Sequence, residues 1–199
     1  MTHSLEWASV TEYLRGFAQY YPGILDWSEK VRAGVPSRQR TVFAYVRDQQ
    51  VMGLAITKNA ELAKLCHISV SPAVREDGIG ASLMCAAILE LLAAGARRAH
   101  VTTSEEVAVE YGAFFASFGF SGHSAQKSRY RRGVDELEWV ASREVLYSAL
   151  LSRCWSKVSE RPSPSFAQLT WDSGQLCFPS HAGSSEVAVG GSLIVHPSR

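Results

Sequence analysis

The chain has 199 residues, of which 46% are hydrophobic and 20% charged, and its formal net charge is +1 at pH 7. This composition is typical of one folded domain, with or without an appended segment, whose hydrophobic core is large enough to be stable without disulfides or a structural metal. The near-zero charge argues against a uniformly basic nucleic-acid-binding protein, and no apolar run approaches the ~20 residues of a membrane span.

The first two predicted elements are helices. Hydrophobic residues recur at spacings of three and four over Glu6–Gln19, which is the pattern of an amphipathic helix, and Pro22 and Gly23 then stop it. A second short helix, with Asp26 as its N-cap, is expected over Asp26–Ala33. Two helices therefore precede any strand.

Three β-rich segments follow the helices. The first two are separated by only Asp48-Gln49-Gln50, which is typical of a hairpin, and the third continues the meander. The predicted strands are Thr41–Arg47, Val51–Thr57 and Leu62–Val70.

Helices and strands then alternate. Gly95 and Gly119 each follow a run of helix-forming residues and are expected to close a helix. The predicted elements are a helix over Ile79–Ala94, a strand over His100–Thr103, a helix over Val107–Ser117, and strands over Ser121–Tyr130 and Glu136–Val140. The order is α-α-β-β-β-α-β-α-β-β.

The character of the sequence changes after about Ser142. One helix is expected through Trp155, followed by a tail rich in Ser, Pro and Gly in which Gln168–Trp171 and Ser192–Val195 can form minor strands. We therefore expect a main domain over residues 1–141 and a C-terminal helix with a loosely ordered tail over residues 142–199.

The cysteines and the N-terminal residues indicate the cellular compartment in which we expect the protein. Four cysteines are widely spaced without a C-x-x-C pair, which argues against a zinc site and against a dense disulfide framework. We expect no metal ion, and reduced thiols of the kind found in a cytoplasmic protein. The N-terminus has neither the basic nor the apolar segment of a signal peptide.

The strongest chemical signal is the segment Val70–Met84, which reads V-S-P-A-V-R-E-D-G-I-G-A-S-L-M. A strand ends where it begins and a helix opens at its glycines, so several backbone N–H groups can surround one anion with no Cβ in the way. The partial positive charge of a helix N-terminus adds to this attraction. A plain glycine turn is the alternative, but strand, proline, arginine and helix together favour a seat for a diphosphate.

This segment resembles the signature of the GNAT superfamily of acyl-CoA-dependent N-acyltransferases, V-x-P-x-x-R-x-x-G-x-G/A at a strand-to-helix junction. The matching positions are Val70, Pro72, Arg75, Gly78 and Gly80. A second family element looks like Phe114–Phe120, with an aromatic pair before a glycine-aromatic step. The resemblance covers roughly Thr41–Val140 and includes the order of the elements.

The resemblance implies an α/β fold of the α+β type, with a mixed, mostly antiparallel central sheet and flanking helices. The sheet would splay between the strands that end at Val70 and Thr103. Acetyl-CoA would bind there as co-substrate, with its pantetheine along the strand and its pyrophosphate on the amides after it. The implied cofactor-binding residues are Ile68, Ser69, Val70, Arg75, Glu76, Asp77, Gly78, Ile79, Gly80, Ala81 and Phe115.

Two side chains common in the family are missing. Many relatives have a tyrosine where this chain has Phe115, and a glutamate where it has Cys66. Candidate catalytic replacements are Glu105 at the end of a predicted strand, Ser104 before it, and Tyr111 one helical turn before Phe115. Each has an ordinary structural alternative: the acid can favour the helix dipole, the serine can be an N-cap, and the tyrosine can pack in the core.

Neighbouring residues offer further alternatives. Cys66 and His67 are adjacent on a strand, so their side chains point to opposite faces and a Cys-His nucleophilic pair is not expected. His67 can equally be an interior histidine with its hydrogen bonds satisfied. Tyr21, Trp27 and Lys30 can line an acceptor pocket or simply pack in the core.

The favoured function is transfer of an acetyl group from acetyl-CoA to a primary amine by direct attack in a ternary complex. The acceptor is expected to be a small-molecule or protein amine, with no membrane partner, and a homodimer is left open. One alternative is a non-catalytic CoA-binding regulatory module. Another is an acylator of aminoacyl-tRNA or nucleobase amines, which rests only on the basic run within His123–Arg132.

Overall fold

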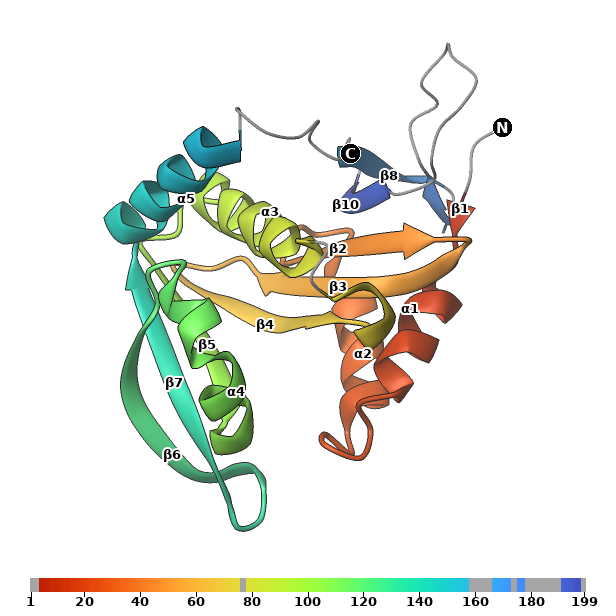
Figure 1. Ribbon diagram of the computed structural model, residues 1–199. Coiled ribbons are helices and arrows are strands. Elements are labelled where there is room, and N and C mark those ends of the chain that lie inside the picture. The colour runs from red at the N-terminus through yellow and green to blue at the C-terminus, as the bar shows by residue number, and fades with distance from the viewer. Residues whose placement is uncertain (1–3, 76–77, 158–165, 173–174, 178–190, 198–199) are drawn as a thin grey trace. The chain divides into compact units, whose positions relative to one another are not determined.

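A computed structural model describes residues 4–75, 78–157, 166–172, 175–177 and 191–197 (Figure 1). The chain divides into two compact units. Unit 1 comprises Met1–Thr57, His67–Ala87 and Pro164–Arg199, and unit 2 comprises Lys58–Cys66 and Ile88–Ser163. Strand β4 (Leu62–Val70) and helix α3 (Ile79–Ala93) each contribute residues to both units.

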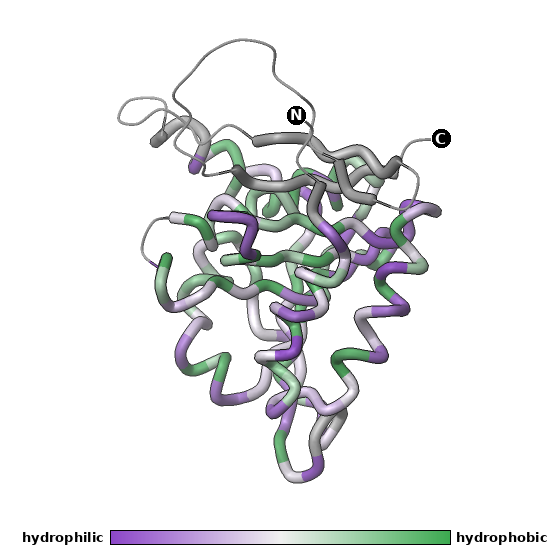
Figure 2. Tube along the Cα trace, turned by 90° about the vertical axis from the view of Figure 1, so that its right-hand side faces the viewer, coloured by the Kyte–Doolittle hydropathy of each residue, from purple (hydrophilic) through white to green (hydrophobic). Residues whose placement is uncertain are grey.

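Unit 1 contains helices α1 (Trp7–Arg15) and α2 (Ile24–Gly34), strands β2 (Arg40–Arg47) and β3 (Gln50–Lys58), and the second half of β4. Helices α1 and α2 lie on one face of these strands, and the start of α3 lies on the other (Figure 1). Hydropathy alternates along the helices of the chain trace (Figure 2), as expected for elements with one buried and one exposed side. The buried residues of α1 illustrate the spacing: Trp7, Val10 and Leu14.

The β2–β3 hairpin turns at Asp48 and Gln49. Their φ angles are 51° and 60°, so both central residues are left-handed, as in a two-residue type I′ turn. This turn matches the twist of the flanking strands. The predicted hairpin is present, and β3 begins one residue earlier than expected.

The C-terminal strands belong to unit 1. Strand β10 (Gly191–Pro197) pairs antiparallel with β2 and parallel with β8 (Phe166–Asp172). Strand β9 (Gln175–Cys177) pairs with β8 and with the short β1 (Ser4–Leu5). Both minor strands expected in the tail are therefore present and longer than predicted, whereas β1 and β9 were not predicted. The rest of the predicted tail lies outside the described residues.

Unit 2 begins with the first half of β4, which pairs parallel with β5 (Arg98–Ser104) from Leu62↔Arg98 to Leu65↔Val101. Strand β7 (Val134–Ser142) is antiparallel to both β5 and β6 (Ser121–Arg131). Helix α4 (Glu105–Ala116) packs on β7, and α5 (Arg143–Lys157) confirms the helix expected after Ser142.

The expected order of helices and strands from α1 to β7 is confirmed. The expected fold class is confirmed as well: the sheet is mixed and mostly antiparallel, with a parallel β4–β5 pair, and helices flank it. The boundary predicted between residues 141 and 142 stays a prediction. Within the described part of the chain, no helix is both long and apolar enough to cross a membrane.

Three helix boundaries were predicted wrongly. Helix α1 ends at Arg15 rather than Gln19, because the chain goes over into turns well before Pro22. Helix α2 begins at Ile24 with Gly23 as N-cap, so Asp26 lies in the first turn and is not the cap. Helix α4 begins at Glu105, two residues early, because Ser104 caps it.

Candidate functional site

The junction between β4 and α3 has the backbone geometry of an anion seat. After β4, a short 3-10 turn (Pro72–Val74) leads to Gly78, whose φ is 76°. The first backbone hydrogen bond of α3 runs from the Ser82 N–H to the Gly78 carbonyl at 3.0 Å. The N–H groups of Ile79, Gly80 and Ala81 precede that bond, so they belong to the helix turn that has no intrahelical acceptors.

The start of α3 is held close to β3. A Cβ on Gly53 would lie 3.0 Å from Leu83 Cδ1 and 3.3 Å from Ile79 Cγ2, so the absence of a side chain permits this approach. The Ser71 N–H donates to the Met52 carbonyl at 2.7 Å and fixes the chain as it leaves β4. The predicted phosphate seat is therefore anchored by unit 1 itself.

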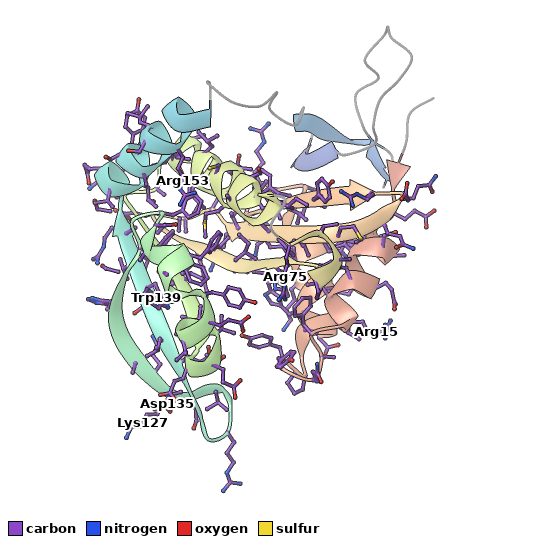
Figure 3. The ribbon with its side chains drawn as sticks, viewed as in Figure 1. Arg15, Arg75, Lys127, Asp135, Trp139 and Arg153 are labelled. Atoms are coloured by element: carbon purple, nitrogen blue, oxygen red, sulfur yellow. The ribbon has the colours of Figure 1, made fainter. Side chains whose placement is uncertain are left out.

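Arg75 lies in the turn after β4 and is exposed (Figure 3). Its Nε donates to the Val70 carbonyl at 3.4 Å, so the guanidinium stays beside the strand end. Two other predicted binding residues, Glu76 and Asp77, lie outside the described residues.

Three polar side chains form a hydrogen-bonded chain between β4 and α1. His67 Nε2 lies 2.7 Å from Ser69 Oγ, and Ser69 Oγ donates to Tyr13 Oη at 3.1 Å. His67 and Ser69 are two residues apart on a strand and so share one face. We call Tyr13, Ser69 and His67 the polar triad.

Aromatic rings surround the polar triad. The Phe17 ring meets the His67 ring edge-on at 5.1 Å between centroids, and the Trp27 ring lies 6.5 Å from it. Phe17 also packs on Tyr13 at 5.7 Å. All three triad side chains are half-buried, so their polar atoms have a largely apolar environment.

This environment keeps the triad uncharged. Burial lowers the pKa of His67 from 6.5 to about 4, since the imidazolium would lose its hydration. Burial also raises the pKa of Tyr13, although the Ser69 hydrogen bond and the positive charge of Arg75 offset part of the rise. Near neutral pH, the triad is thus a chain of neutral hydrogen-bonding groups with a cation nearby.

The three predicted catalytic residues lie on β5 and α4. The Ser104 hydroxyl accepts from the Val107 N–H at 3.4 Å and is the N-cap of α4, as its structural alternative anticipated. Glu105 is exposed in the first turn of α4, where a carboxylate favours the helix dipole. Tyr111 is half-buried on the same helix. Their catalytic roles stay predictions.

Phe115, predicted to contact the coenzyme, is 3% exposed. Its ring packs against Phe114 at 5.6 Å and against Trp139 of β7 at 6.0 Å (Figure 3 labels Trp139). Trp139 Nε1 in turn donates to Thr103 Oγ1 at 2.9 Å. The residue in the position of the family tyrosine is thus part of the packing of unit 2, and its coenzyme contact stays a prediction.

Comparison with known proteins decides the family. The family model described as the acetyltransferase (GNAT) domain matches residues 16–139. The chain belongs to the GNAT acetyltransferase family. The resemblance inferred from Val70–Gly80 is thereby confirmed, and so is the prediction of an acyl-CoA-dependent acetyltransferase that uses acetyl-CoA as co-substrate.

Solved structures of GNAT proteins share the fold. A GNAT-family protein from Desulfovibrio desulfuricans is 17% identical, with 72% of this chain and 97% of that chain covered at a TM-score of 0.59. The ribosomal-protein-S18-alanine N-acetyltransferase of Escherichia coli is 22% identical (71% and 92% covered, TM-score 0.55). Ard1 from Thermoplasma volcanium is 16% identical (71% and 96% covered, TM-score 0.57). Among curated proteins, none matches the sequence.

The backbone geometry after β4 is compatible with the predicted diphosphate site, which stays a prediction. Gly78 adopts a backbone conformation that L side chains rarely take, and an open helix turn follows it, which suits a diphosphate. Within the described residues, no cluster of His, Cys, Asp and Glu could hold a metal ion.

Sequence reasoning predicted the turn from β4 into α3, whose binding of a phosphate stays a prediction, and it missed the polar triad. Ser69 was expected to contribute its backbone and His67 to be an interior histidine, and Tyr13 falls within the helix predicted over Glu6–Gln19 without having been singled out as a site residue. The structure brings the three together, and the Trp27 ring lies 6.5 Å from the His67 ring. The role of Trp27 in an acceptor pocket stays a prediction. The common side-chain face of His67 and Ser69 was the available signal. The basic run stays an untested hint, with Lys127 exposed on β6.

Proposed function

We propose that this GNAT member transfers an acetyl group from acetyl-CoA to a primary amine by direct attack within a ternary complex. The observation that carries the proposal is the β4–α3 junction: a left-handed glycine, Gly78, followed immediately by the open first turn of α3. This arrangement has N–H groups that lack intrahelical acceptors, a favourable helix dipole and no Cβ at Gly78.

The residues of unit 1 have separable tasks in this proposal. The amides at the start of α3, from Ile79 to Ala81, hold the pyrophosphate, and the backbone of Ile68–Val70 lies along the pantetheine. The Val70 N–H stabilises the carbonyl oxygen as negative charge develops on it. Acetyl-CoA supplies the activated acetyl group. Holding the amine beside this group provides much of the rate enhancement, even without a tyrosine at Phe115.

Calorimetric titration with acetyl-CoA tests the proposal. Gly78→Glu should reduce binding at least 100-fold, because a carboxylate would project into the diphosphate seat. Gly95→Glu is the matched control: Gly95 also has a positive φ, 83°, follows the other end of α3, and would have nothing within 4 Å of an added Cβ. Equal binding by wild type and Gly78→Glu, or no binding by wild type, would refute the proposed seat.

A non-catalytic CoA-binding module is the second candidate, because the residue in the family tyrosine position, Phe115, is buried against Trp139 and has no proton to donate. A thiol-release assay over a panel of amines separates the two functions. Amine-dependent release supports the enzyme. Binding of acetyl-CoA with no amine-dependent release supports the module.

The acceptor and the cellular setting belong to the same proposal. A small-molecule or protein amine is the expected acceptor, and the names of two fold relatives, an aminoglycoside 6'-N-acetyltransferase and the S18-alanine enzyme, describe both kinds. We also propose a cytoplasmic location; within the described residues, Cys66 and Cys85 form no disulfide. Nucleic-acid acceptors and a homodimer remain secondary parts of the proposal.

A further inference from the structure

The polar triad lies directly beside the residue proposed to bind the thioester carbonyl. Ser69 precedes Val70 in β4, and its side chain reaches Tyr13 on α1, 56 positions away in the sequence. Phe17, in the turn after α1, and Trp27 of the neighbouring α2 flank the triad. The proposed ternary complex requires an amine near Val70, and Ser69 of the triad is the residue next to Val70 in β4.

The hydrogen bonds of the triad have one consistent direction. Ser69 has a single hydroxyl hydrogen, and it is donated to Tyr13 Oη. Ser69 Oγ therefore accepts from His67 at the 2.7 Å contact, which requires the neutral tautomer protonated on Nε2. Tyr13 already accepts from Ser69, and within the described residues its own hydroxyl hydrogen has no acceptor.

A phenol hydrogen that has no acceptor within the described residues can distinguish the two forms of an amine. A neutral amine has a lone pair that can accept this hydrogen, whereas an ammonium ion has only donors. The positive charge of Arg75 acts on Tyr13 through space and further disfavours a cation there. The titratable or charged groups that the described structure records around the triad are Tyr13, His67 and Arg75, none of them anionic near pH 7.

We propose that Tyr13 Oη, oriented by Ser69 and His67, recognises the acceptor's amino group in its uncharged form. The enzyme then prefers weakly basic amines, such as the α-amino groups of peptides and amino-acid amides, over lysine ε-amines. This inference rests on the proposed acetyltransferase function and specifies its acceptor. Tyr13 is a specificity-determining residue, and His67 and Ser69 position it.

The reaction balances without a protein carboxylate. The ammonium ion loses one proton to water before it binds, which frees the nitrogen lone pair. The nitrogen leaves the Tyr13 hydrogen bond and attacks the thioester carbon, so that the C–N bond forms, the C–S bond breaks and its electron pair goes to sulfur. The second proton from nitrogen then neutralises the thiolate. The products are the acetylated amine, the free thiol and one proton in solution.

The pKa values of the two kinds of amine in solution determine how strongly the enzyme prefers α-amines. An α-amino group has a pKa of about 8 and a lysine ε-amine about 10.4, so at pH 7 the uncharged fraction differs by roughly 250-fold. An enzyme that binds only the uncharged amine inherits most of this ratio. An enzyme with its own general base in contact with the amine loses much of it, because it can bind the ammonium ion and then deprotonate it.

Steady-state kinetics with two acceptors tests the preference: alanine amide for an α-amine and Nα-acetyl-lysine amide for an ε-amine. We expect kcat/KM at pH 7 to favour alanine amide by about 100-fold, and each profile to rise with pH up to the acceptor's own pKa. Equal rates at pH 7, or a lysine profile that levels off well below pH 9, would overturn the inference.

Tyr13→Phe removes only the hydroxyl group. It should raise KM for alanine amide about ten-fold while kcat changes less than three-fold, because the lost hydrogen bond acts in binding. Tyr20→Phe is the matched control on an exposed tyrosine and should behave as wild type. An unchanged KM in Tyr13→Phe would refute the role of Tyr13, provided that thermal unfolding shows that the variant is folded.

Nitrogen-15 NMR of the histidines provides a readout that needs neither coenzyme nor turnover. We expect the His67 ring to be neutral and protonated on Nε2 from pH 8 down to pH 5. The opposite tautomer would make Ser69 donate to His67 and turn the Tyr13 hydrogen inward, which overturns the inference. If acetyl-CoA binds but alanine amide is not acetylated, the acceptor inference fails alone; if acetyl-CoA does not bind, the proposed function fails with it.

Discussion

His67 is a titratable side chain whose surroundings favour its neutral form. It lies between the Phe17 and Trp27 rings, and its partner is the neutral hydroxyl of Ser69. Burial therefore lowers its pKa to about 4, compared with 6.5 in a solvated chain. The difference links the protonation of one ring to the stability of the fold.

We expect the free energy of unfolding to fall as pH is lowered from about 6.5 to about 4. In that window the unfolded chain binds a proton at His67 and the folded chain does not, so acid favours unfolding. The loss is on the order of 3 kcal/mol in total and stops below pH 4, where both states are protonated. Urea unfolding at several pH values measures it. His67→Gln should lack this part of the slope, and an identical slope in the variant would contradict the assignment.

Residues of the phosphate seat could be predicted from sequence because they act through a local backbone pattern. Val70, Arg75 and Gly78 lie within nine positions of one another, and the glycine conformation follows from the turn into a helix. Tyr13 and Ser69 could not be paired in this way. Their contact depends on how α1 lies on β4, and helix periodicity indicates which side is buried but not what it meets.

At the scale of elements, α4 has well-defined signals at both ends. Ser104 caps its N-terminus, and Gly119, with a φ of 86°, lies just after it. The Phe120 N–H bonds to the Phe115 carbonyl at 3.2 Å and the Gly119 N–H to the Ala116 carbonyl at 2.9 Å, which is a Schellman motif. The sequence predicted that Gly119 closes the helix. Ser104 was recognised as a candidate N-cap, yet the predicted helix start was two residues late.

Ser104→Ala should lower the free energy of unfolding by about 1 kcal/mol, because the Val107 N–H loses its acceptor at the N-terminus of α4. Ser104→Thr keeps a hydroxyl and should lose much less. Chemical denaturation of both variants checks this. If Ser104→Ala reduces turnover without changing stability, the residue acts in the chemistry and its capping bond contributes little.

Gly53→Ala should destabilise the protein by about 1 to 2 kcal/mol and weaken acetyl-CoA binding. The added methyl group would lie 3.0 Å from Leu83 Cδ1 and 3.3 Å from Ile79 Cγ2, so these side chains at the start of α3 must shift to make room. Gly122→Ala is the matched control, since a methyl group on that strand glycine would have nothing within 4 Å. Calorimetry and thermal unfolding give both quantities. Unchanged binding in Gly53→Ala would show that the seat tolerates this displacement.

At the scale of the whole molecule, the order of helices and strands could be predicted from the sequence, but the division into two units could not. Each helix and strand has its own periodicity, so the order from α1 to β7 follows from the sequence. The chain passes from one unit to the other after Thr57, Cys66 and Ala87, which lie within β3, β4 and α3. Composition gives no boundary signal within these continuous elements. The C-terminal strands join unit 1 through β2, a pairing far apart in sequence.

Removal of residues 164–199 should destabilise unit 1. Strand β10 pairs with Phe43–Val46 of β2, so the truncation leaves the hydrogen-bonding edge of a buried strand without its partner. We expect faster amide hydrogen exchange in β2, a lower Tm and a greater tendency to aggregate. Unchanged protection of the β2 amides would mean that these residues are an accessory tail.

The discontinuous course of unit 1 has a consequence for synthesis on the ribosome. Every residue of unit 2 has been translated once Ser163 is added, whereas unit 1 still lacks Pro164–Arg199. Because folding during translation proceeds from the N-terminus, the unit with the phosphate seat is the last to be completed. Until then the nascent chain exposes the edge of β2, and this interval is when a chaperone would have most to protect.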